Sequence, residues 1–137
     1  MQKGTFLGCY GKNVKTKAGS DNIVEFAVKI PSKDNPDKTI WLPIDSKLPT
    51  SSYDAIVAAR NGADKKALED AQKAFSRTVK SFAKDIHDKY IDPPNTTDFA
   101  IMFLPFEGAY AEAVSNPDLF EGLQRELKII IAQWRNR

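Results

Sequence analysis

An aspartate and a lysine lie two residues apart at the end of an apolar run, in "WLPIDSKLP" over residues 41–49. Side chains of a β-strand alternate between the two faces of a sheet, so Asp45 and Lys47 would project from the same face. A carboxylate beside an ammonium group can bind a metal ion and a phosphate. Asp-x-Lys is a very weak pattern, however, and an ordinary surface ion pair worth about 0–1 kcal/mol is the alternative.

A second carboxylate comes from the preceding segment of the chain. "NIVEFAVKI", residues 22–30, alternates with the period of two that is typical of a strand with one buried face. Turn-forming residues at 31–38 separate it from "TIWLPIDSK", which predicts an antiparallel hairpin. With the turn centred near residue 35, the numbers of opposed residues sum to about 70, and Glu25 falls opposite Asp45.

Glu25, Asp45 and Lys47 would then converge on one spot of the sheet. Two opposed carboxylates destabilise a sheet unless a cation lies between them, and this cation can be Lys47 or a metal ion. Mg²⁺, or Mn²⁺ in its place, takes one or two carboxylates together with water and a substrate phosphate. Lys47 could orient or deprotonate a water for attack on phosphorus, or stabilise the negative charge that develops there. The set therefore indicates a metal-dependent phosphodiesterase.

The middle of the chain predicts two helices that follow the hairpin. Residues 50–61 predict a short helix with a Thr or Ser side chain as its cap and a stop at Asn61 and Gly62. Apolar residues at steps of three or four predict a long helix from near Asp64 to Tyr90. Two prolines follow and end this helix, because proline has no backbone donor.

The C-terminal third predicts two more strands and two more helices. "DFAIMFLP", residues 98–105, is apolar without alternation, which predicts a central strand covered on both faces. Residues 107–114 and 117–127 predict helices, and "KIIIA", residues 128–132, a buried strand that pairs with the earlier one in parallel. The predicted fold is therefore α/β, with a mixed sheet of an antiparallel hairpin followed by parallel strands, flanked by helices.

The composition predicts one domain over residues 1–137 and excludes several kinds of site. No apolar stretch approaches the ~20 residues that a membrane span needs, and no signal peptide is apparent. A single cysteine fits a reducing compartment, so we expect a cytoplasmic protein without disulfides. With one Cys and one His, a zinc site built from these residue types is excluded.

Other charged residues are candidates for contacts with a substrate. Lys12, Lys15 and Lys17 form the densest basic cluster and predict phosphate contacts with DNA, although a solvated lead-in to the first strand is the alternative. Glu107 follows a predicted strand at its C-terminal end, where α/β sheets often bind ligands, and it is a candidate accessory residue. A favourable position at the start of the next helix explains Glu107 equally well.

Three stretches resemble the RmuC family of bacterial DNA recombination proteins: "VEFAVKIP", "WLPIDSKLP" and, above all, "DKYIDPPNTTDFAIMFLPFEGAYAEA". The resemblance runs from about Lys12 to Ala132. It implies a restriction-endonuclease-like core, the PD-(D/E)XK nuclease fold, which acts on DNA in recombination and in limiting rearrangements. Glu25 matches the first acidic position of that motif, Asp45 the second, and Lys47 its lysine. DNA is then the partner, and Mg²⁺ or Mn²⁺ the metal.

Members of this family are usually far longer than the present chain, with a membrane-proximal or coiled-coil region before the match and further helices after it. We therefore expect an excised or truncated core of such a protein. Three functions stay open: a Mg²⁺-dependent deoxyribonuclease, a DNA-binding or assembly scaffold of the same fold without turnover, and a remnant that forms homo-oligomers through an exposed core.

Overall fold

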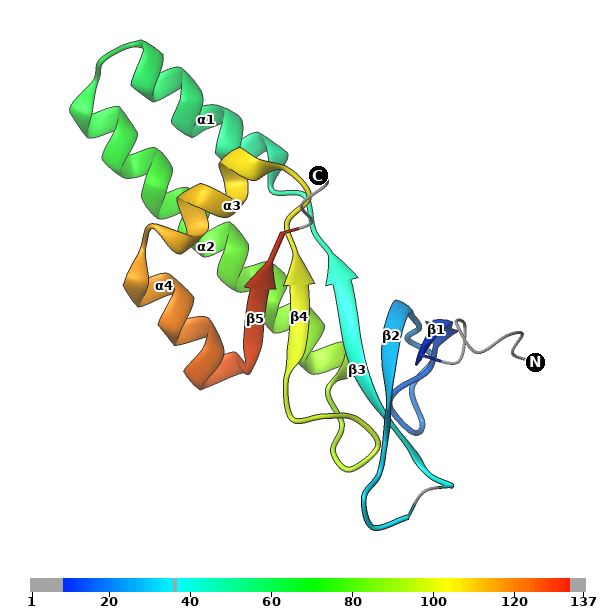
Figure 1. Cartoon of the computed structure of the whole chain (residues 1–137). Coiled ribbons are helices and arrows are strands. Elements are labelled where there is room, and N and C mark those ends of the chain that lie inside the picture. Colours follow the sequence, from blue (N-terminus) through cyan, green and yellow to red (C-terminus); the bar gives the residue numbers. More distant parts are fainter. Residues whose placement is uncertain (1–8, 36, 134–137) are drawn as a thin grey trace.

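A five-stranded sheet with helices packed against it makes up the fold (Figure 1). The computed structural model describes residues 9–35 and 37–133. The strands are β1 (Tyr10–Val14), β2 (Val24–Pro31), β3 (Thr39–Ser46), β4 (Ala100–Phe103) and β5 (Ile129–Ala132). The helices are α1 (Thr50–Asn61), α2 (Lys65–Tyr90), α3 (Glu107–Val114) and α4 (Pro117–Gly122), and a π-helical turn, η2 (Leu123–Leu127), continues the last of them.

The sheet is mixed, as the sequence predicts. Its strands lie side by side in chain order, β1-β2-β3-β4-β5. β1, β2 and β3 pair antiparallel, whereas β3, β4 and β5 pair in parallel through helical crossovers. The predicted α/β class and the order of an antiparallel hairpin followed by parallel strands are therefore confirmed.

The hairpin of β2 and β3 has the expected register. Phe26 lies opposite Ile44 and Ala27 opposite Pro43, so opposed residue numbers keep the predicted sum. The paired residues end at Phe26 and Ile44, and extending this register by one residue would set Glu25 opposite Asp45. The turn is closed by hydrogen bonds from the Lys38 amide to the Asn35 carbonyl, at 2.9 Å, and from the Ser32 amide to the Lys38 carbonyl, at 3.2 Å.

β1 is a strand that the sequence pattern does not predict. Its sequence, YGKNV, lacks the alternation of an amphipathic strand, and it pairs with β2 across a loop, with Tyr10 opposite Val28. Asn13 has a φ of 56°, in the left-handed region, where Asn is tolerated better than most residues. Lys12 is therefore a residue of the sheet edge rather than of a solvated lead-in.

The short and the long helix predicted after the hairpin form as expected, with one difference at a cap. The Asp64 carboxylate accepts a hydrogen bond from the Ala67 amide at 3.1 Å and caps α2. At the start of α1, the capping residue is Pro49, which offers no side-chain acceptor. The predicted Thr or Ser cap is therefore wrong, and the Ser52 hydroxyl instead donates to the Pro49 carbonyl at 3.3 Å.

The core lies between one face of the sheet and the helices, and in Figure 1 α2 runs behind β4 and β5. Alternate residues of β4 and β5 are buried there: Ala100, Met102, Ile129 and Ile131. The residues between them, such as Ile101 and Ile130, are half-buried. The prediction that β4 is covered on both faces is therefore wrong for the described part of the chain. No helix in that part is both long and apolar enough to span a membrane.

Candidate metal and phosphate site

Asp45 and Lys47 meet a third charged residue at the C-terminal end of β3. The Lys47 ammonium nitrogen lies 3.4 Å from Oδ2 of Asp45 and 3.0 Å from Oδ2 of Asp85, a residue of α2. Parallel pairing with β4 holds the strand end, since Asp45 lies beside Met102 and the Lys47 amide donates to the Phe103 carbonyl at 3.0 Å. The predicted convergence of Asp45 and Lys47 is thus present, with a carboxylate from the helix added to it.

The three side chains of this cluster are partly buried. The side chains of Asp45, Lys47 and Asp85 are 19%, 22% and 35% exposed, respectively. The ring centre of Phe82, three residues before Asp85 on α2, lies 5.7 Å from the Lys47 nitrogen. Charges at this depth are screened less by water than exposed ones, so the ammonium group is held by two carboxylates and an aromatic ring.

The pKa values of the cluster follow from this arrangement. Burial by itself would lower the pKa of Lys47, but the hydrogen bond that Lys47 donates to Asp85 and the charges of Asp45 and Asp85 outweigh it and raise that pKa. Burial would raise the pKa of Asp85, but hydrogen bonds from Lys47 and Lys89 lower it. Burial and then the negative charge of Asp45 raise the pKa of Tyr90. At neutral pH, Lys47 is therefore an ammonium ion and Asp85 a carboxylate.

Glu25 lies at the edge of this arrangement. It is exposed on β2, opposite Asp45 by continuation of the hairpin register, and no hydrogen bond or ion pair joins it to Asp45 or Lys47 among the described residues. Glu25 also lines an apolar hollow of about 620 Å³, together with Phe26 and Phe103. The structure therefore brings together two of the three predicted site residues through direct contacts.

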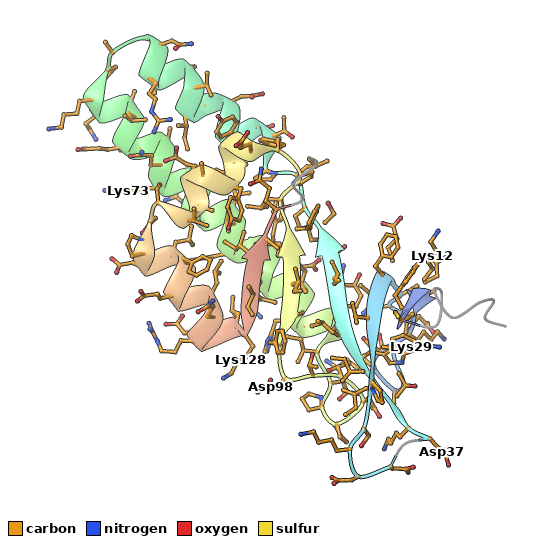
Figure 2. All side chains as sticks on the ribbon, viewed as in Figure 1. Lys12, Lys29, Asp37, Lys73, Asp98 and Lys128 are labelled. Carbon is orange, nitrogen blue, oxygen red and sulfur yellow. The ribbon has the colours of Figure 1, made fainter. Side chains whose placement is uncertain are left out.

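The three lysines predicted to contact phosphate do not form one cluster. Lys12 lies with its nitrogen 5.8 Å from the ring centre of Phe26, and Figure 2 shows it at the β1 side of the sheet. Lys15 lies 3.7 Å from a carboxylate oxygen of Asp21. Lys17 donates a hydrogen bond of 2.8 Å to the carbonyl of Asp88, near the end of α2.

Glu107, the predicted accessory residue, is the first residue of α3 and is exposed. No ion pair or side-chain hydrogen bond connects it to another described residue. A carboxylate in the first turn of a helix interacts favourably with the helix dipole, which accounts for its position. The neighbouring Tyr53 ring packs directly against Gly108, where a Cβ atom would collide with the phenol oxygen.

Comparison with known proteins identifies the family. The model of the RmuC family matches residues 4–135 of the chain. The chain belongs to the RmuC family. Two proteins described as "DNA recombination protein RmuC homolog", from Xylella fastidiosa strains Temecula1 and 9a5c, are each 42% identical to it over 123 residues. The match covers 90% of this RmuC chain and 27% of each relative, so the chain spans about a quarter of their length. No solved structure matches it.

The carboxylates of this RmuC chain can be compared with the needs of a metal ion. No three Asp, Glu, His or Cys side chains within residues 9–35 and 37–133 are grouped so as to hold one. Asp45 and Asp85 do present two carboxylates to one cation, and two is a number that Mg²⁺ often uses when water and phosphate complete its shell. The hard oxygen donors therefore fit such an ion, and Lys47 now supplies the positive charge between them.

Asp85 is the site residue that sequence reasoning missed in this RmuC chain. It lies 38 positions beyond Lys47 in the chain, so no local spacing links the two. One signal does exist: Asp85 directly precedes the buried residue Ile86 on the border of the apolar stripe of α2. A charged residue at such a border lies next to whatever the stripe packs on, but the sequence alone does not tell which strand that is.

Proposed function

We propose that this RmuC chain carries a restriction-endonuclease-like core that binds DNA and hydrolyses its phosphodiester bonds with Mg²⁺ or Mn²⁺. The observation that carries the proposal is the partly buried cluster of Asp45, Lys47 and Asp85 at the end of β3. The sheet order supports it, because an antiparallel hairpin leads into parallel strands at the site. The names of the two relatives support a role in DNA recombination.

Each residue of the cluster has a distinct task in this proposal. Asp45 would hold the metal ion together with Glu25 across the hairpin or Asp85 across the gap to α2. Once bound, the ion would supply Lewis acidity toward the phosphate and activate a water for attack. The carboxylates orient that ion and fix the place where the phosphate enters.

Lys47 acts by its charge in this proposal, rather than as a base. Two carboxylates raise its pKa, so the side chain is an ammonium ion at neutral pH and has no free electron pair for a proton. An ammonium ion fixed in a partly buried place stabilises the negative charge that develops on phosphate oxygens in the transition state. Because its partners already hold it, Lys47 needs little reorganisation when the reaction occurs.

A second function, a DNA-binding or assembly scaffold without turnover, is favoured by one specific observation. Within the described residues no group of three metal-binding side chains exists, and Lys47 already pairs with both nearby carboxylates. A protein of this kind would still bind phosphate through Lys15 and Lys17, in a salt-dependent manner. In either case DNA is the partner, and we place the protein in the cytoplasm.

Cleavage assays with labelled single-stranded and duplex DNA separate the two functions. With Mg²⁺ or Mn²⁺ present, the chain should cleave, whereas Asp45→Ala and Lys47→Ala should bind without cleaving. The exposed ion pair of Lys66 and Asp70 on α2 offers matched controls, since Lys66→Ala and Asp70→Ala remove the same groups elsewhere.

The outcome of that assay decides between the candidates. Salt-sensitive binding without any cleavage by the unaltered chain would support the scaffold. Cleavage that persists at the same rate in Asp45→Ala and Lys47→Ala would show that the chemistry lies elsewhere in the protein. Loss of cleavage in the Lys66 and Asp70 controls as well would assign the effect to stability rather than to the site.

A further inference from the structure

A polar cavity lies at the other end of β3, away from the charged cluster. Its volume is about 480 Å³, a size that fits a small organic ligand. The loop between β1 and β2 lines it with residues 15–21, β3 with Thr39 and Trp41, and the loop after α2 with Asn95. None of the residues of the charged cluster takes part in this lining.

Hydrogen bonds fix the three segments that form the cavity. Thr16 is 3% exposed, and its hydroxyl donates to the Tyr90 carbonyl at 2.7 Å, which ties the loop to the end of α2. The Trp41 amide donates to the Asn95 carbonyl at 3.0 Å, and the Thr97 amide donates to the Trp41 carbonyl at 2.9 Å. The cavity is therefore part of the folded framework rather than a gap between free loops.

Trp41 lines the cavity, and its indole N–H has no hydrogen-bond partner in the described part of the chain. The far end of its indole lies against Gly11, where an added Cβ atom would be only 2.9 Å from Cη2 of the ring. No described residue accepts a hydrogen bond from the indole N–H, and no side-chain nitrogen or oxygen of the described residues is sealed from solvent without a partner. The N–H is therefore in contact with solvent, on a residue that lines the cavity.

The remaining polar groups suit a ligand that is partly anionic. Lys17 uses its ammonium group for one hydrogen bond to the Asp88 carbonyl, and its other two donors have no hydrogen-bond acceptor among residues 9–35 and 37–133. Lys15, 59% exposed, lies 3.7 Å from Asp21, the carboxylate of the lining. Asn95 donates through its amide nitrogen to Asp92 at 3.0 Å, which leaves its side-chain oxygen as an acceptor.

We propose that this cavity binds one unpaired nucleotide of single-stranded DNA. Its base would lie against Trp41 and bond to Asn95, and its phosphate would lie at Lys15 and Lys17. Bases stack on aromatic rings irrespective of sequence, and lysines attract the backbone. The inference rests on the proposed function, because it takes DNA as the ligand. Trp41 and Asp45 are four residues apart on one face of β3, about 13 Å, so a bound strand lies near the charged cluster.

Tryptophan fluorescence tests this inference directly. The chain has two tryptophans, and Trp134→Phe leaves Trp41 as the sole reporter. In EDTA, a short oligothymidylate should quench Trp41, whereas an abasic strand of equal length should bind without quenching it. By anisotropy of labelled oligothymidylate, Asn95→Ala and Lys15→Ala should each weaken binding, and Trp41→Leu should weaken it about tenfold. Lys73→Ala, which removes an exposed lysine of α2 seen in Figure 2, is the matched charge control.

The possible results separate failure of this inference from failure of the proposed function. If both strands bind equally and neither changes Trp41 emission, the cavity does not take a base, although DNA binding stands. If neither strand binds by anisotropy, both proposals are overturned. If thymidine monophosphate quenches Trp41 but the oligothymidylate does not, the cavity is a site for free nucleotides and the inference is wrong. Because quenching is read from an intact Trp41, misfolding of Trp41→Leu would not decide the result.

Discussion

The lysines near the two ends of β3 differ in how the protein holds them. At the C-terminal end, Lys47 is bound by Asp45 and Asp85, and its charge is fixed by the protein. Near the N-terminal end, Lys15 and Lys17 line a polar cavity beside Trp41, where Lys15 lies 3.7 Å from Asp21 and Lys17 donates to the Asp88 carbonyl. We propose that this difference reflects a division of tasks, with transition-state stabilisation by Lys47 at one end and ligand binding at the other.

Removal of the positive charge of Lys47 should have the largest effect, and this effect should be on the rate of DNA cleavage. Lys47→Met should lower the single-turnover rate of DNA cleavage about 100-fold, because an ammonium ion placed at the developing charge is lost. DNA affinity should change little, since Lys47 is already neutralised by its partners. Rapid-quench measurements at saturating DNA check this, with Lys66→Met on the exposed face of α2 as control. An equal loss of affinity and rate would contradict the separation of tasks.

Loss of the buried hydrogen bond between Thr16 and the Tyr90 carbonyl, beside the cavity, should lower the stability of the fold. Thr16→Val removes the hydroxyl that donates to the Tyr90 carbonyl and leaves this carbonyl without its partner. The free energy of unfolding should fall by about 1–2 kcal/mol. Urea denaturation followed by circular dichroism measures the change, and Thr50→Val at the exposed start of α1 is the control. A change no larger than that of the control would mean that the loop is not anchored by this bond.

Loss of Lys15 and Lys17 should weaken DNA binding and leave the cleavage rate nearly unchanged, which is the opposite of the effect expected for loss of Lys47. The double variant Lys15→Ala, Lys17→Ala should bind DNA about tenfold more weakly at low salt, with a shallower dependence of affinity on salt concentration. The cleavage rate at saturating DNA should stay close to that of the unaltered chain. Salt titrations of binding by anisotropy test this expectation. An unchanged salt dependence would remove these lysines from the DNA contact.

The pH dependence of stability should give the smallest effect. The pKa of Asp85 is lowered in the folded protein. The stabilisation of the fold by this carboxylate is therefore present above the usual pKa of 3.8 and is lost as the pH falls through the pKa of the folded state. The pKa of Lys47 is raised in the folded protein. The stabilisation from its charge is therefore present below the usual pKa of 10.5 and is lost as the pH rises through the pKa of the folded state.

Asp85→Asn should therefore lower the free energy of unfolding by less than about 1 kcal/mol at neutral pH, since Asp85 is partly exposed. The difference from the unaltered chain should vanish at strongly acidic pH. Urea denaturation across the pH range measures it, and the double variant with Lys47→Met should show less than additive loss. Additive losses would mean that the two side chains do not interact.

Local patterns predicted much of the fold. The turn residues at 31–38 predicted the hairpin register. The alternation of side chains in a strand assigned Asp45 and Lys47 to one face before any contact was known. The apolar stripe of α2 gave its length and its buried side. The Asp64 cap also follows from local rules, because a side chain and an amide three residues away decide it.

Other features could not be predicted, because they depend on contacts between distant parts of the chain. The bond of Lys47 to Asp85 and that of Thr16 to Tyr90 join residues 38 and 74 positions apart. β1 has no alternation of its own and is defined by its pairing with β2. A short apolar strand such as β4 has the same sequence pattern whether one or both of its faces are covered. The half-buried face of the sheet could therefore not be predicted.

Binding of a paramagnetic ion tests the central claim most directly. Substoichiometric Mn²⁺ broadens the amide signals of residues near its site in a nuclear magnetic resonance spectrum of the chain. If the end of β3 is a metal site, the signals of Asp45, Ser46, Lys47 and Asp85 should broaden first, and excess Mg²⁺ should restore them. Equal broadening at exposed acids such as Asp70, or no selective broadening at all, would contradict the account.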